Sequence, residues 1–392
     1  MLLALFNIND YDASMVDKSK VAIVGIGETE YSRESGRSEL VLTLEAIMKA
    51  LEDAGINPHE VDGLMRWSVD TSSEAIVAEN LGVKSLNWFG DISQAGNVGA
   101  ALVASACAAI RSNLAETIVI YRGVNGRSGR RYGSGAVTGR RGQGLGAFSE
   151  PFGLLTPQHG LAMMTQRRMY ETGITSRHFG MVSVTERFHA NRNPRATFFD
   201  RPLTIEDHQN SRFVVEPFRL FDCCLEPDGG GAIVLTSLER AKSLRKPPAV
   251  VRAAAQHAYA SSRDYTDTAA KFIAPRLWSQ AQISPSEVSV AQIYDHFSPF
   301  VIFALEDYGF VARGEGGDFV ESGQMSWDGG ILPVNTSGGH LSEAYMQGMN
   351  QLLEGVRQVR GTSTSQVQDV AFSFVDTGIG TGALVLEPDI YG

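Results

Sequence analysis

The sequence predicts a layered α/β protein made of two related halves, and three observations support this prediction. From Lys20 onward, short apolar runs rich in β-branched residues alternate with longer amphipathic stretches. This alternation is typical of strands and helices in a mostly parallel sheet. The same order starts again near residue 249, and two short segments recur in both parts. A chain of 392 residues has room for two or three domains, or for one duplicated domain.

The first half begins with VAIVGIG at 21–27, an apolar run that predicts a strand. An amphipathic stretch predicts a helix over 38–55. The alternation then predicts a strand, a helix, a strand, a helix and a strand at 61–67, 74–82, 86–93, 97–113 and 117–123. A Gly-rich run, DGGGAIVL at 228–235, predicts the strand that closes this half.

The second half repeats this order. Its expected elements are a strand at 249–260, a helix at 268–281, a strand at 290–295, apolar runs at 301–309 and 332–337, a helix from 341, and strands at 369–378 and 382–388.

Two pairs of segments support a duplication. INPHEV (56–61) and ISPSEV (283–288) both follow a predicted helix and precede a predicted strand, and GTGALVL (380–386) matches DGGGAIVL. We therefore expect an N-terminal half over 20–240, with an insertion at about 124–215, and a C-terminal half over 241–392.

Composition and charge argue against several classes of function. The formal net charge of −10 does not favour a nucleic-acid-binding protein, which would have a basic domain. No apolar run approaches the roughly 18 residues that a membrane span needs. The N-terminal stretch has no evident cleavage site, so we expect no signal peptide. Three cysteines, Cys107, Cys223 and Cys224, make no disulfide framework and have no zinc-site spacing. We expect a cytoplasmic protein without a metal ion.

Four segments carry a resemblance to a known family. VAIVGIGETEYSR resembles the first strand of the thiolase fold, and PFRLFDCCLEPDGGGAIVL (217–235) resembles the segment that closes the first half of sterol-carrier-protein-type thiolases. QIYDHFSPF (292–300) is similar to their His-Asp-Cys-Phe loop, and NTSGGHLSEAYMQG (335–348) to their Gly-Gly … Gly-His-Pro loop. Over about residues 20–390 the chain resembles the thiolase superfamily. The resemblance implies two βαβαβαββ halves in a five-layered α-β-α-β-α arrangement, with a loop-domain insertion in the first half.

The chain departs from this family at the nucleophile. A thiolase needs a nucleophilic cysteine at the start of a helix, where the helix dipole lowers its pKa. The alignment places Ala95 at that position. Cys107 lies about three helical turns further along and is typical of a buried, small apolar residue. Without the cysteine, the thiolase route to an acyl-enzyme is closed.

The two motif loops also differ from the family pattern. Tyr294 stands where the family has a histidine, and His296 stands where it has a cysteine, while Asp295 is retained. In the other loop, Tyr345 takes the place of the catalytic histidine, and His340 falls on an ordinary position. Two tyrosines in place of two histidines indicate a changed chemistry, because a decayed site would show unrelated small or apolar residues.

This pattern resembles the thiolase-like aldolases of steroid side-chain degradation, also called lipid-transfer proteins. Their activity implies retro-aldol cleavage of a β-hydroxyacyl-CoA, of the 17-hydroxy steroid C-22 type, to a 17-ketosteroid and propionyl-CoA. The resemblance also implies a homodimer and a small OB-fold, zinc-ribbon-like partner protein. No cofactor is expected, because CoA is part of the substrate. Two alternatives remain open: a thiolase-like acyltransferase with its nucleophile elsewhere, and a non-catalytic acyl-CoA or lipid carrier or scaffold subunit.

A retro-aldol reaction needs a base for the β-hydroxyl, stabilisation of the enolate and an acid for the α-carbon. The motif loops contain no lysine and no metal-ligand cluster, so donors at the thioester carbonyl would have to suffice. Tyrosine, with a reference pKa of about 10, is a poor base unless its pKa is lowered, but a reasonable acid toward an enolate carbon. We predict that Tyr294 and Tyr345 form the acid/base pair, with Asp295 or His296 orienting one phenol.

Substrate-binding candidates lie in two regions. Backbone amides near Gly338, Gly339 and Gly378, together with His340, are candidates around the thioester. The arginine-rich run of the insertion contains Arg127, Arg130, Arg131, Arg140 and Arg141. It could contact CoA phosphates, order against a partner chain or remain a solvated loop. Met163, Met164 and Met169 could line an acyl pocket or pack in a helix interface. Asp222, Cys223 and Cys224 are expected to be structural.

Overall fold

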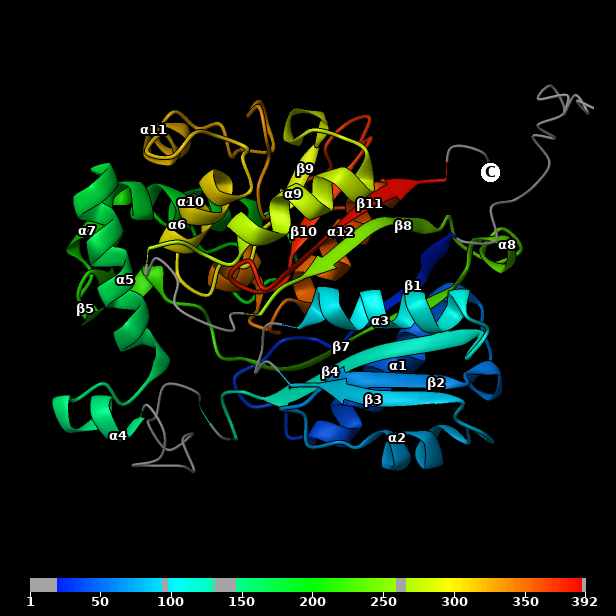
Figure 1. The fold of residues 1–392 in the computed structure, drawn as a ribbon. Coiled ribbons are helices and arrows are strands. Elements are labelled where there is room, and N and C mark those ends of the chain that lie inside the picture. The colour runs from blue at the N-terminus through cyan, green and yellow to red at the C-terminus, as the bar shows by residue number, and fades with distance from the viewer. Residues whose placement is uncertain (1–19, 94–97, 130, 132–145, 259–265, 390–392) are drawn as a thin grey trace, which may run out of the picture.

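A computed structural model describes residues 20–93, 98–129, 131, 146–258 and 266–389. Its centre is a nine-stranded sheet with the order β3-β2-β4-β7-β1-β8-β11-β10-β9 (Figure 1). The strands are β1 (Val21–Glu28), β2 (Gly63–Trp67), β3 (Trp88–Ile92), β4 (Thr117–Asn125), β7 (Asp228–Ser237), β8 (Ala249–Gln256), β9 (Val290–Gln292), β10 (Ser373–Asp376) and β11 (Gly382–Pro388). β5 (Phe213–Val215) and β6 (Phe218–Arg219) form a separate pair.

The sheet has two arms with the same internal order. One arm is β3-β2-β4-β7-β1 and the other is β9-β10-β11-β8, and they join where Ala22 pairs with Val250. β2 pairs in parallel with β3 and β4, and β9 pairs in parallel with β10. The other five pairings of this sheet are antiparallel, so the expectation of a mostly parallel sheet was wrong. In the second arm the apolar run at 332–337 contributes one bridge, between Val334 and Ala291, and no strand. The pairing cannot continue because Asn335 turns the chain with φ of 51°.

Three hydrophobic clusters divide the molecule into layers. The main helices are α1 (Glu39–Ala54), α2 (Glu74–Leu81), α3 (Gly99–Arg111), α9 (Ala270–Ala281), α10 (Pro299–Asp307) and α12 (Met349–Arg360). The first cluster joins α1 to one face of the first arm, and the second packs α3 and α12 against both arms. The third packs α9 and α10 against the outer face of the second arm. The expected helix–sheet–helix–sheet–helix arrangement is confirmed, and Figure 1 shows α3 between the two arms.

The recurring segments take the same local structure in both halves. INPHEV forms the short 3₁₀ turn η1 (Pro58–Glu60) and ISPSEV forms η5 (Pro285–Glu287). Each turn begins with a capping box, Asn57 with Glu60 and Ser284 with Glu287, in which the two residues satisfy each other's backbone amides. Along the chain, each turn leads into the second strand of its half: η1 into β2 and η5 into β9. The expected boundaries of the halves, at residue 240 and at 124–215, stay a prediction.

The helices of the insertion lie at one end of the molecule. They are α4 (Gly146–Ser149), η3 (Glu150–Phe152), α5 (Pro157–Thr172), α6 (Ser176–Ala190) and α7 (Ile205–Asn210). The remaining short elements are η4 (Leu220–Asp222), α8 (Leu238–Ala241), α11 (Gly316–Glu321) and η6 (Gly339–Glu343). Within the described part of the chain, no helix combines the length and apolar character needed to cross a membrane.

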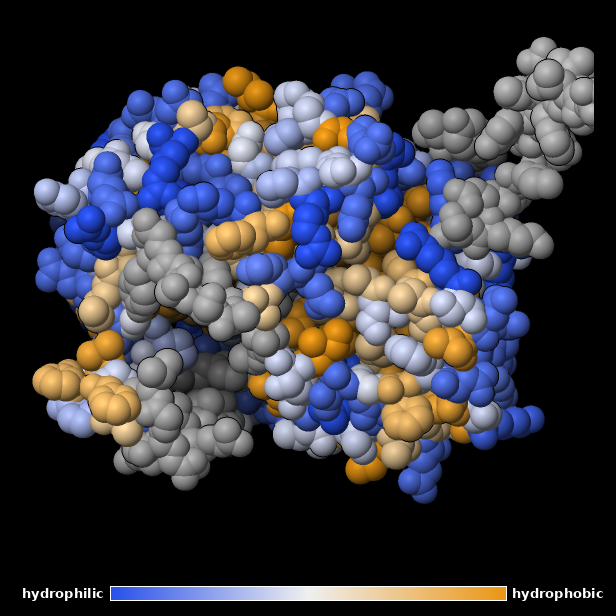
Figure 2. Space-filling model, viewed as in Figure 1, coloured by the Kyte–Doolittle hydropathy of each residue, from blue (hydrophilic) through white to orange (hydrophobic). Residues whose placement is uncertain are grey.

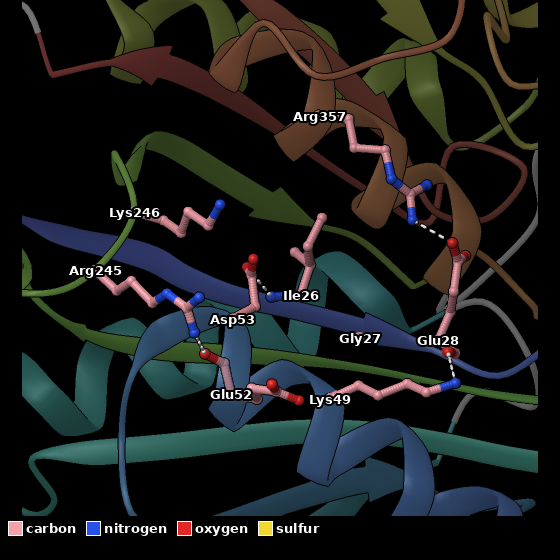
Figure 3. A pocket seen from close by; sticks show the side chains of 9 residues that line it. All are labelled: Ile26, Gly27, Glu28, Lys49, Glu52, Asp53, Arg245, Lys246 and Arg357. Carbon is pink, nitrogen blue, oxygen red and sulfur yellow. Dashed lines mark hydrogen bonds and ion pairs between the residues drawn. The ribbon is translucent and has the colours of Figure 1, made fainter.

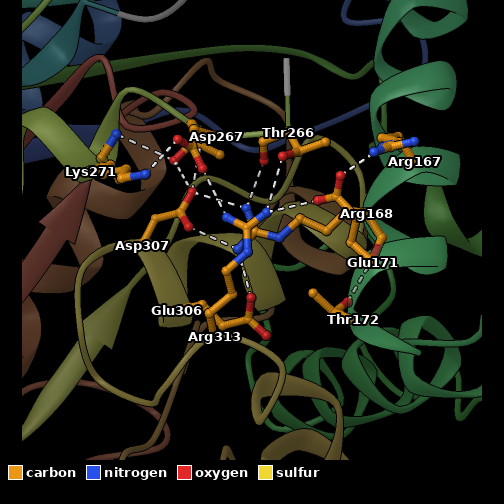
Figure 4. Close-up of polar contacts among 12 residues, drawn as sticks. Arg167, Arg168, Glu171, Thr172, Thr266, Asp267, Lys271, Glu306, Asp307 and Arg313 are labelled. Atoms are coloured by element: carbon orange, nitrogen blue, oxygen red, sulfur yellow. Dashed lines mark hydrogen bonds and ion pairs between the residues drawn. The ribbon is translucent and has the colours of Figure 1, made fainter. Parts of the chain in front are cut away.

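Arg168 of α5 fastens the insertion to the second half (Figure 4). Its guanidinium is fully buried and donates to the Glu306 carboxylate at 2.6 Å, the Asp307 carboxylate at 2.8 Å and the Thr266 carbonyl at 2.8 Å. Glu306 and Asp307 end α10, the helix that starts just after the 292–298 loop. The salt bridge therefore fixes both the insertion and the far end of α10.

The helix expected from residue 341 begins later, so that prediction was wrong. Residues 339–343 form η6, a single π-helical turn, and α12 starts only at Met349. Gln347 and Gly348 have φ of 53° and 91°, a left-handed conformation that an α-helix excludes. The segment between the two helices is thus a loop, and it carries Tyr345.

Candidate active site

Two loops bring the predicted tyrosines together. Tyr294 follows β9, and Tyr345 precedes α12, 51 residues later. Their hydroxyl oxygens are 2.8 Å apart, a hydrogen bond in which either phenol can donate. Tyr294 is 1% exposed, and Tyr345 is half-buried. One phenol from each motif loop therefore meets the other at the edge of the protein interior.

The glycine pair explains how the loops approach so closely. Gly338 and Gly339 have φ of 109° and 57°. A Cβ atom on Gly339 would lie 2.4 Å from Oδ2 of Asp295, and one on Gly338 would lie 2.6 Å from the Cβ of Ala190 in α6. Single π-helical turns such as η6 are rare and occur often at functional sites. The glycines let the loop press against Asp295 on one side and α6 on the other.

Asp295 lies behind the phenols and is fully buried. Its Oδ2 accepts a hydrogen bond from the Leu341 amide at 3.0 Å, and its Oδ1 accepts one from Nε2 of Gln351 at 2.8 Å. Burial raises the pKa of this carboxyl. These donors tie the 292–298 loop to η6 and to α12, so Asp295 fixes the relative position of the segments that carry the two tyrosines.

His340 occupies the space between Asp295 and the tyrosines. Its Nε2 accepts a hydrogen bond from the Gly348 amide at 3.2 Å, so the ring proton belongs on Nδ1, which lies 3.2 Å from Oδ1 of Asp295. The ring packs edge-to-face on Tyr294 and on Tyr345, with centroid distances of 4.6 and 4.9 Å. Burial lowers the pKa of His340 well below its ordinary value, which keeps it neutral. This fully buried position favours a role in holding the phenols over the expected contact with CoA.

His296 is enclosed by aromatic rings. It is 7% exposed and lies 5.2 Å from the Tyr294 ring and 4.8 Å from those of Phe297 and Phe300, between centroids. Neither ring nitrogen has a hydrogen-bond partner among the described residues. Burial lowers the pKa of His296 to about 3. The side chain is therefore neutral, and it forms a wall of the site next to Tyr294.

His296→Phe is expected to make the protein more resistant to acid. The folded protein keeps His296 neutral down to about pH 3, whereas the unfolded chain binds a proton near the reference pKa of about 6.5. The stability due to the neutral histidine is complete above about pH 6.5 and is lost as the pH falls toward 3, by up to about 1.4 kcal/mol per pH unit. Urea unfolding of both proteins along this range measures the slope. If the free energies of unfolding of the variant and the parent change with pH in parallel, the predicted role of His296 is contradicted.

A third segment, residues 223–226, borders both loops. The Cys224 amide donates to the His296 carbonyl at 3.0 Å, and the Leu225 amide donates to the His340 carbonyl at 3.0 Å. The Glu226 carboxylate pairs with the Arg131 guanidinium at 2.7 Å. Arg131 thus lies near the site by way of this segment.

The other binding candidates have different environments. Arg127 is exposed, and its amide donates to Asp228 at 2.9 Å. Arg130, Arg140 and Arg141 lie outside the described residues, as does Ala95. The Gly378 amide donates to Oδ1 of Asp376 at 3.1 Å. That bond occupies one of the expected thioester donors.

Among the residues expected to be structural, Asp222 and Cys107 lie in buried positions. Asp222 is buried, and its carboxylate accepts hydrogen bonds from Nε2 of His208 at 2.7 Å and from the Ser298 hydroxyl at 2.5 Å, next to the start of α10. Cys107 is buried in α3, and burial raises its pKa to about 12. Met164 and Met169 pack on the core of the second arm, and Met163 is exposed.

Sequence reasoning missed Asp376, which ends β10. It is fully buried, and it accepts hydrogen bonds from the Tyr308 hydroxyl at 3.3 Å and from the Gly378 amide. Burial raises its pKa to about 7. The β10 end also contacts the start of α3, where the Ala100 amide donates to the Thr377 hydroxyl at 2.8 Å. The sequence did contain a signal for this residue, because Asp376 stands between an apolar strand and the Gly-rich turn TGIGTG.

A charged cleft of about 370 Å³ lies elsewhere on the molecule (Figure 3). Its lining residues are Ile26, Gly27, Glu28, Lys49, Glu52, Asp53, Arg245, Lys246 and Arg357. None of the predicted site residues is among them. Opposite charges neutralise each other there, as in the ion pair of Arg357 with Glu28 at 2.5 Å. Among the described residues, no group of three or more His, Cys, Asp or Glu side chains is arranged to hold a metal ion.

Comparisons with known proteins agree with this fold. The thiolase C-terminal domain-like family model matches residues 252–385. A solved structure titled "Ltp2-ChsH2(DUF35) aldolase" superposes with a TM-score of 0.88 at 43% identity, covering 95% of this chain and 98% of that one. The chain belongs to the thiolase superfamily, in the group that contains the steroid side-chain-cleaving aldolases.

Two relatives in this group have names that state an activity. "Steroid side-chain-cleaving aldolase" from Thermomonospora curvata is 45% identical over 94% of this chain and 98% of its own length. "17-hydroxy-3-oxo-4-pregnene-20-carboxyl-CoA lyase" from Mycobacterium tuberculosis is 44% identical over 94% of this chain and 99% of its own length.

Proposed function

We propose that this protein is a carbon–carbon lyase that cleaves the β-hydroxyacyl-CoA thioester of a steroid side chain by retro-aldol chemistry. The substrate is of the 17-hydroxy steroid C-22 CoA type, and the products are a 17-ketosteroid and propionyl-CoA. The observation that carries the proposal is the contact of two tyrosine hydroxyls at 2.8 Å in the motif loops. The activity stated in the names of the two relatives supports it.

The reaction needs two proton transfers. A base takes the proton of the β-hydroxyl, the bond between the α- and β-carbons breaks, and the β-carbon becomes the ketone. The electrons of that bond form the enolate of the thioester, which then takes a proton on its α-carbon. Tyr294 and Tyr345 are the acid/base pair in this proposal, because their shared hydrogen bond allows a proton to move between them. His340 and Asp295 hold the pair in place.

The enolate needs donors at the thioester oxygen. The start of α3 is suited to this, because the first amides of a helix carry partial positive charge. The Ala100 amide is already engaged with the Thr377 hydroxyl, so the donors in this proposal are other amides of the first turn. In this proposal CoA is part of the substrate, and the enzyme needs no separate cofactor. Arg131, which is close to the site, would contact the phosphates of CoA.

A protein partner is proposed from the solved aldolase, whose title includes a DUF35 component. We propose that this chain binds a small OB-fold, zinc-ribbon-like protein. The end of the insertion suits such a contact: Phe148 of α4 and Phe152 of η3 are 77% and 83% exposed. Figure 2 shows apolar side chains gathered on this projection. We also propose a cytoplasmic location, which the three free cysteines favour.

A homodimer is proposed through the outer edge of β3. Within the described sheet β3 pairs only with β2, and Phe89 on it is 66% exposed. Phe89→Asp is expected to shift the protein from dimer to monomer, because a charge on an apolar contact must be desolvated for the strands to meet. Analytical ultracentrifugation measures the change. Ile331→Asp, at a residue that is 78% exposed in a loop, is the matched control and should leave the dimer intact. A dimeric Phe89→Asp variant would contradict the proposed edge.

The acyltransferase alternative needs a thiolate. Burial raises the pKa of Cys107 and of Cys223 to about 12, and that of Cys224 lies well above its ordinary value for the same reason. Thiols of this kind are protonated near neutral pH. Alkylation with iodoacetamide tests the alternative, since loss of activity that follows a labelled cysteine would favour it over the aldolase.

The proposed function is tested by incubating the protein with a 17-hydroxy steroid C-22 CoA thioester, alone and with the partner protein. Formation of the 17-ketosteroid together with propionyl-CoA is the expected result. Tight binding of the thioester without cleavage, even with the partner present, would identify a carrier or scaffold subunit instead.

A further inference from the structure

Helix α6 of the insertion presents three polar side chains to the loop that carries Tyr345. Glu186, His189 and Asn193 follow the i, i+3, i+7 spacing of one helix face, with Asn193 just past the last helical turn. Nδ1 of His189 lies 3.1 Å from the Asn335 carbonyl oxygen, and Nδ2 of Asn193 donates to the Ser337 carbonyl at 3.1 Å. The third member, Glu186, reaches furthest into the active site.

Glu186 is fully buried against Asn335 and Asp295. Its Oε1 accepts a hydrogen bond from Nδ2 of Asn335 at 2.7 Å. A Cβ on Gly339 would meet both Oδ2 of Asp295, at 2.4 Å, and Nδ2 of Asn335, at 3.0 Å, so the two side chains lie on the same side of that glycine. Oε2 of Glu186 has no hydrogen-bond donor among the described residues. Its neighbour is the Asp295 carboxyl, which interacts with it directly.

Neither carboxyl has a cationic partner. Within the described chain, neither Glu186 nor Asp295 forms an ion pair with a lysine or an arginine. The titratable groups that face the pair are His340 from η6, Cys224 from the 223–226 segment and His189 from α6 itself. Burial keeps all three uncharged, because it lowers the pKa of the histidines and raises that of the thiol. Two adjacent buried carboxyls in such surroundings cannot both be ionised.

We propose that Glu186 is a positioning residue, whose protonated carboxyl donates a hydrogen bond from Oε2 to the Asp295 carboxylate. Asp295 then keeps its charge beside His340, whose Nδ1 lies 3.2 Å from Oδ1, and the His340 ring packs on those of Tyr294 and Tyr345. The inference rests on the proposed function, since it assigns a part in that reaction to a helix of the insertion. Burial and the charge of Asp295 raise the pKa of Glu186 well above its ordinary value, which supports a proton there at neutral pH.

The first test is independent of catalysis. Because the folded protein holds a proton that the unfolded chain releases near the ordinary pKa of glutamic acid, stability due to this proton is greatest in acid and falls as the pH rises. Glu186→Gln supplies a donor that does not titrate. Its free energy of unfolding should improve relative to the parent as the pH rises above about 5, by up to about a tenfold change in the folding equilibrium per pH unit. Glu206→Gln, at an exposed carboxylate of α7, is the control and should parallel the parent.

The second test uses turnover of the steroid thioester in the presence of the partner. Glu186→Gln should exceed Glu186→Leu in kcat by at least about tenfold with little difference in KM, because only the amide can donate to Asp295. The Gln variant should also keep its activity to higher pH than the parent.

The outcomes separate this inference from the proposed function. A Glu186→Gln stability curve that parallels the parent, or Gln and Leu variants with equal kcat, would overturn the shared proton. If Glu186→Leu does not fold, the stability curves of the Gln variant and the parent decide. A parent that fails to cleave the thioester, while the stability of Glu186→Gln and of the parent diverges with pH as expected, is a separate outcome. In that case the shared proton of the carboxyl pair is supported and the proposed reaction is contradicted.

Discussion

Tyr345→Phe is expected to lower turnover of the steroid thioester by about 10²- to 10⁴-fold, the range that general acid–base groups contribute. The change removes one hydroxyl and leaves the ring that packs on His340, so folding should be preserved. Tyr294→Phe should have a similar effect, because each hydroxyl is the hydrogen-bond partner of the other. The loss should appear in kcat, since the proton transfers occur in the chemical step.

The double variant provides a further check on the tyrosine pair. If the two phenols act as one unit, Tyr294→Phe together with Tyr345→Phe should be little slower than either single variant. Tyr170→Phe, at a residue of α5 that is 82% exposed, is the control and should turn over normally. Near-normal turnover of both single variants would rule out the tyrosine mechanism.

Arg168→Leu is expected to destabilise the protein by about 3–5 kcal/mol, because it leaves the Glu306 and Asp307 carboxyls buried without their cation. The guanidinium also packs over the ring of Phe303, 4.5 Å from its centroid, and this contact would be lost. Urea unfolding at neutral pH measures the free energy change.

The neighbouring residue of α5 is a matched control for this change. Arg167 pairs with Glu171 at 2.6 Å, but its side chain is 61% exposed. Arg167→Leu should therefore cost less than about 1 kcal/mol. Equal losses for the two variants would mean that the buried ion pairs do not hold the insertion in place.

The fold was largely predictable from the sequence, because strand and helix periodicity and the recurring INPHEV and ISPSEV segments are local signals. The apolar run at 332–337 does not reveal that this segment forms no strand. Its apolar residues are buried as expected, but the left-handed Asn335 limits pairing to one bridge. The start of α12 was misplaced for a similar reason. Helical spacing does not reveal that Gln347 and Gly348 leave the helical conformation.

The site was predictable in part. Tyr294 and Tyr345 could be paired because each sits in a recognisable motif loop, and the structure brings their hydroxyls into contact. The place of His340 could not be read from its spacing, because the π-helical turn η6 rotates it toward Asp295. Glu186 lies 109 positions before Asp295 in a separate helix, and no local pattern connects residues so far apart. Contacts of this kind are set by the packing of the insertion on the second half.

The most direct test of the tyrosine retro-aldol is to run the reaction in D₂O and determine the mass of the propionyl-CoA and of the intact protein. We expect propionyl-CoA with a single deuterium on its α-carbon, formed with the 17-ketosteroid, and a protein that carries no acyl group. Recovery of an acylated cysteine during turnover, or of a short-chain product without deuterium, would contradict it.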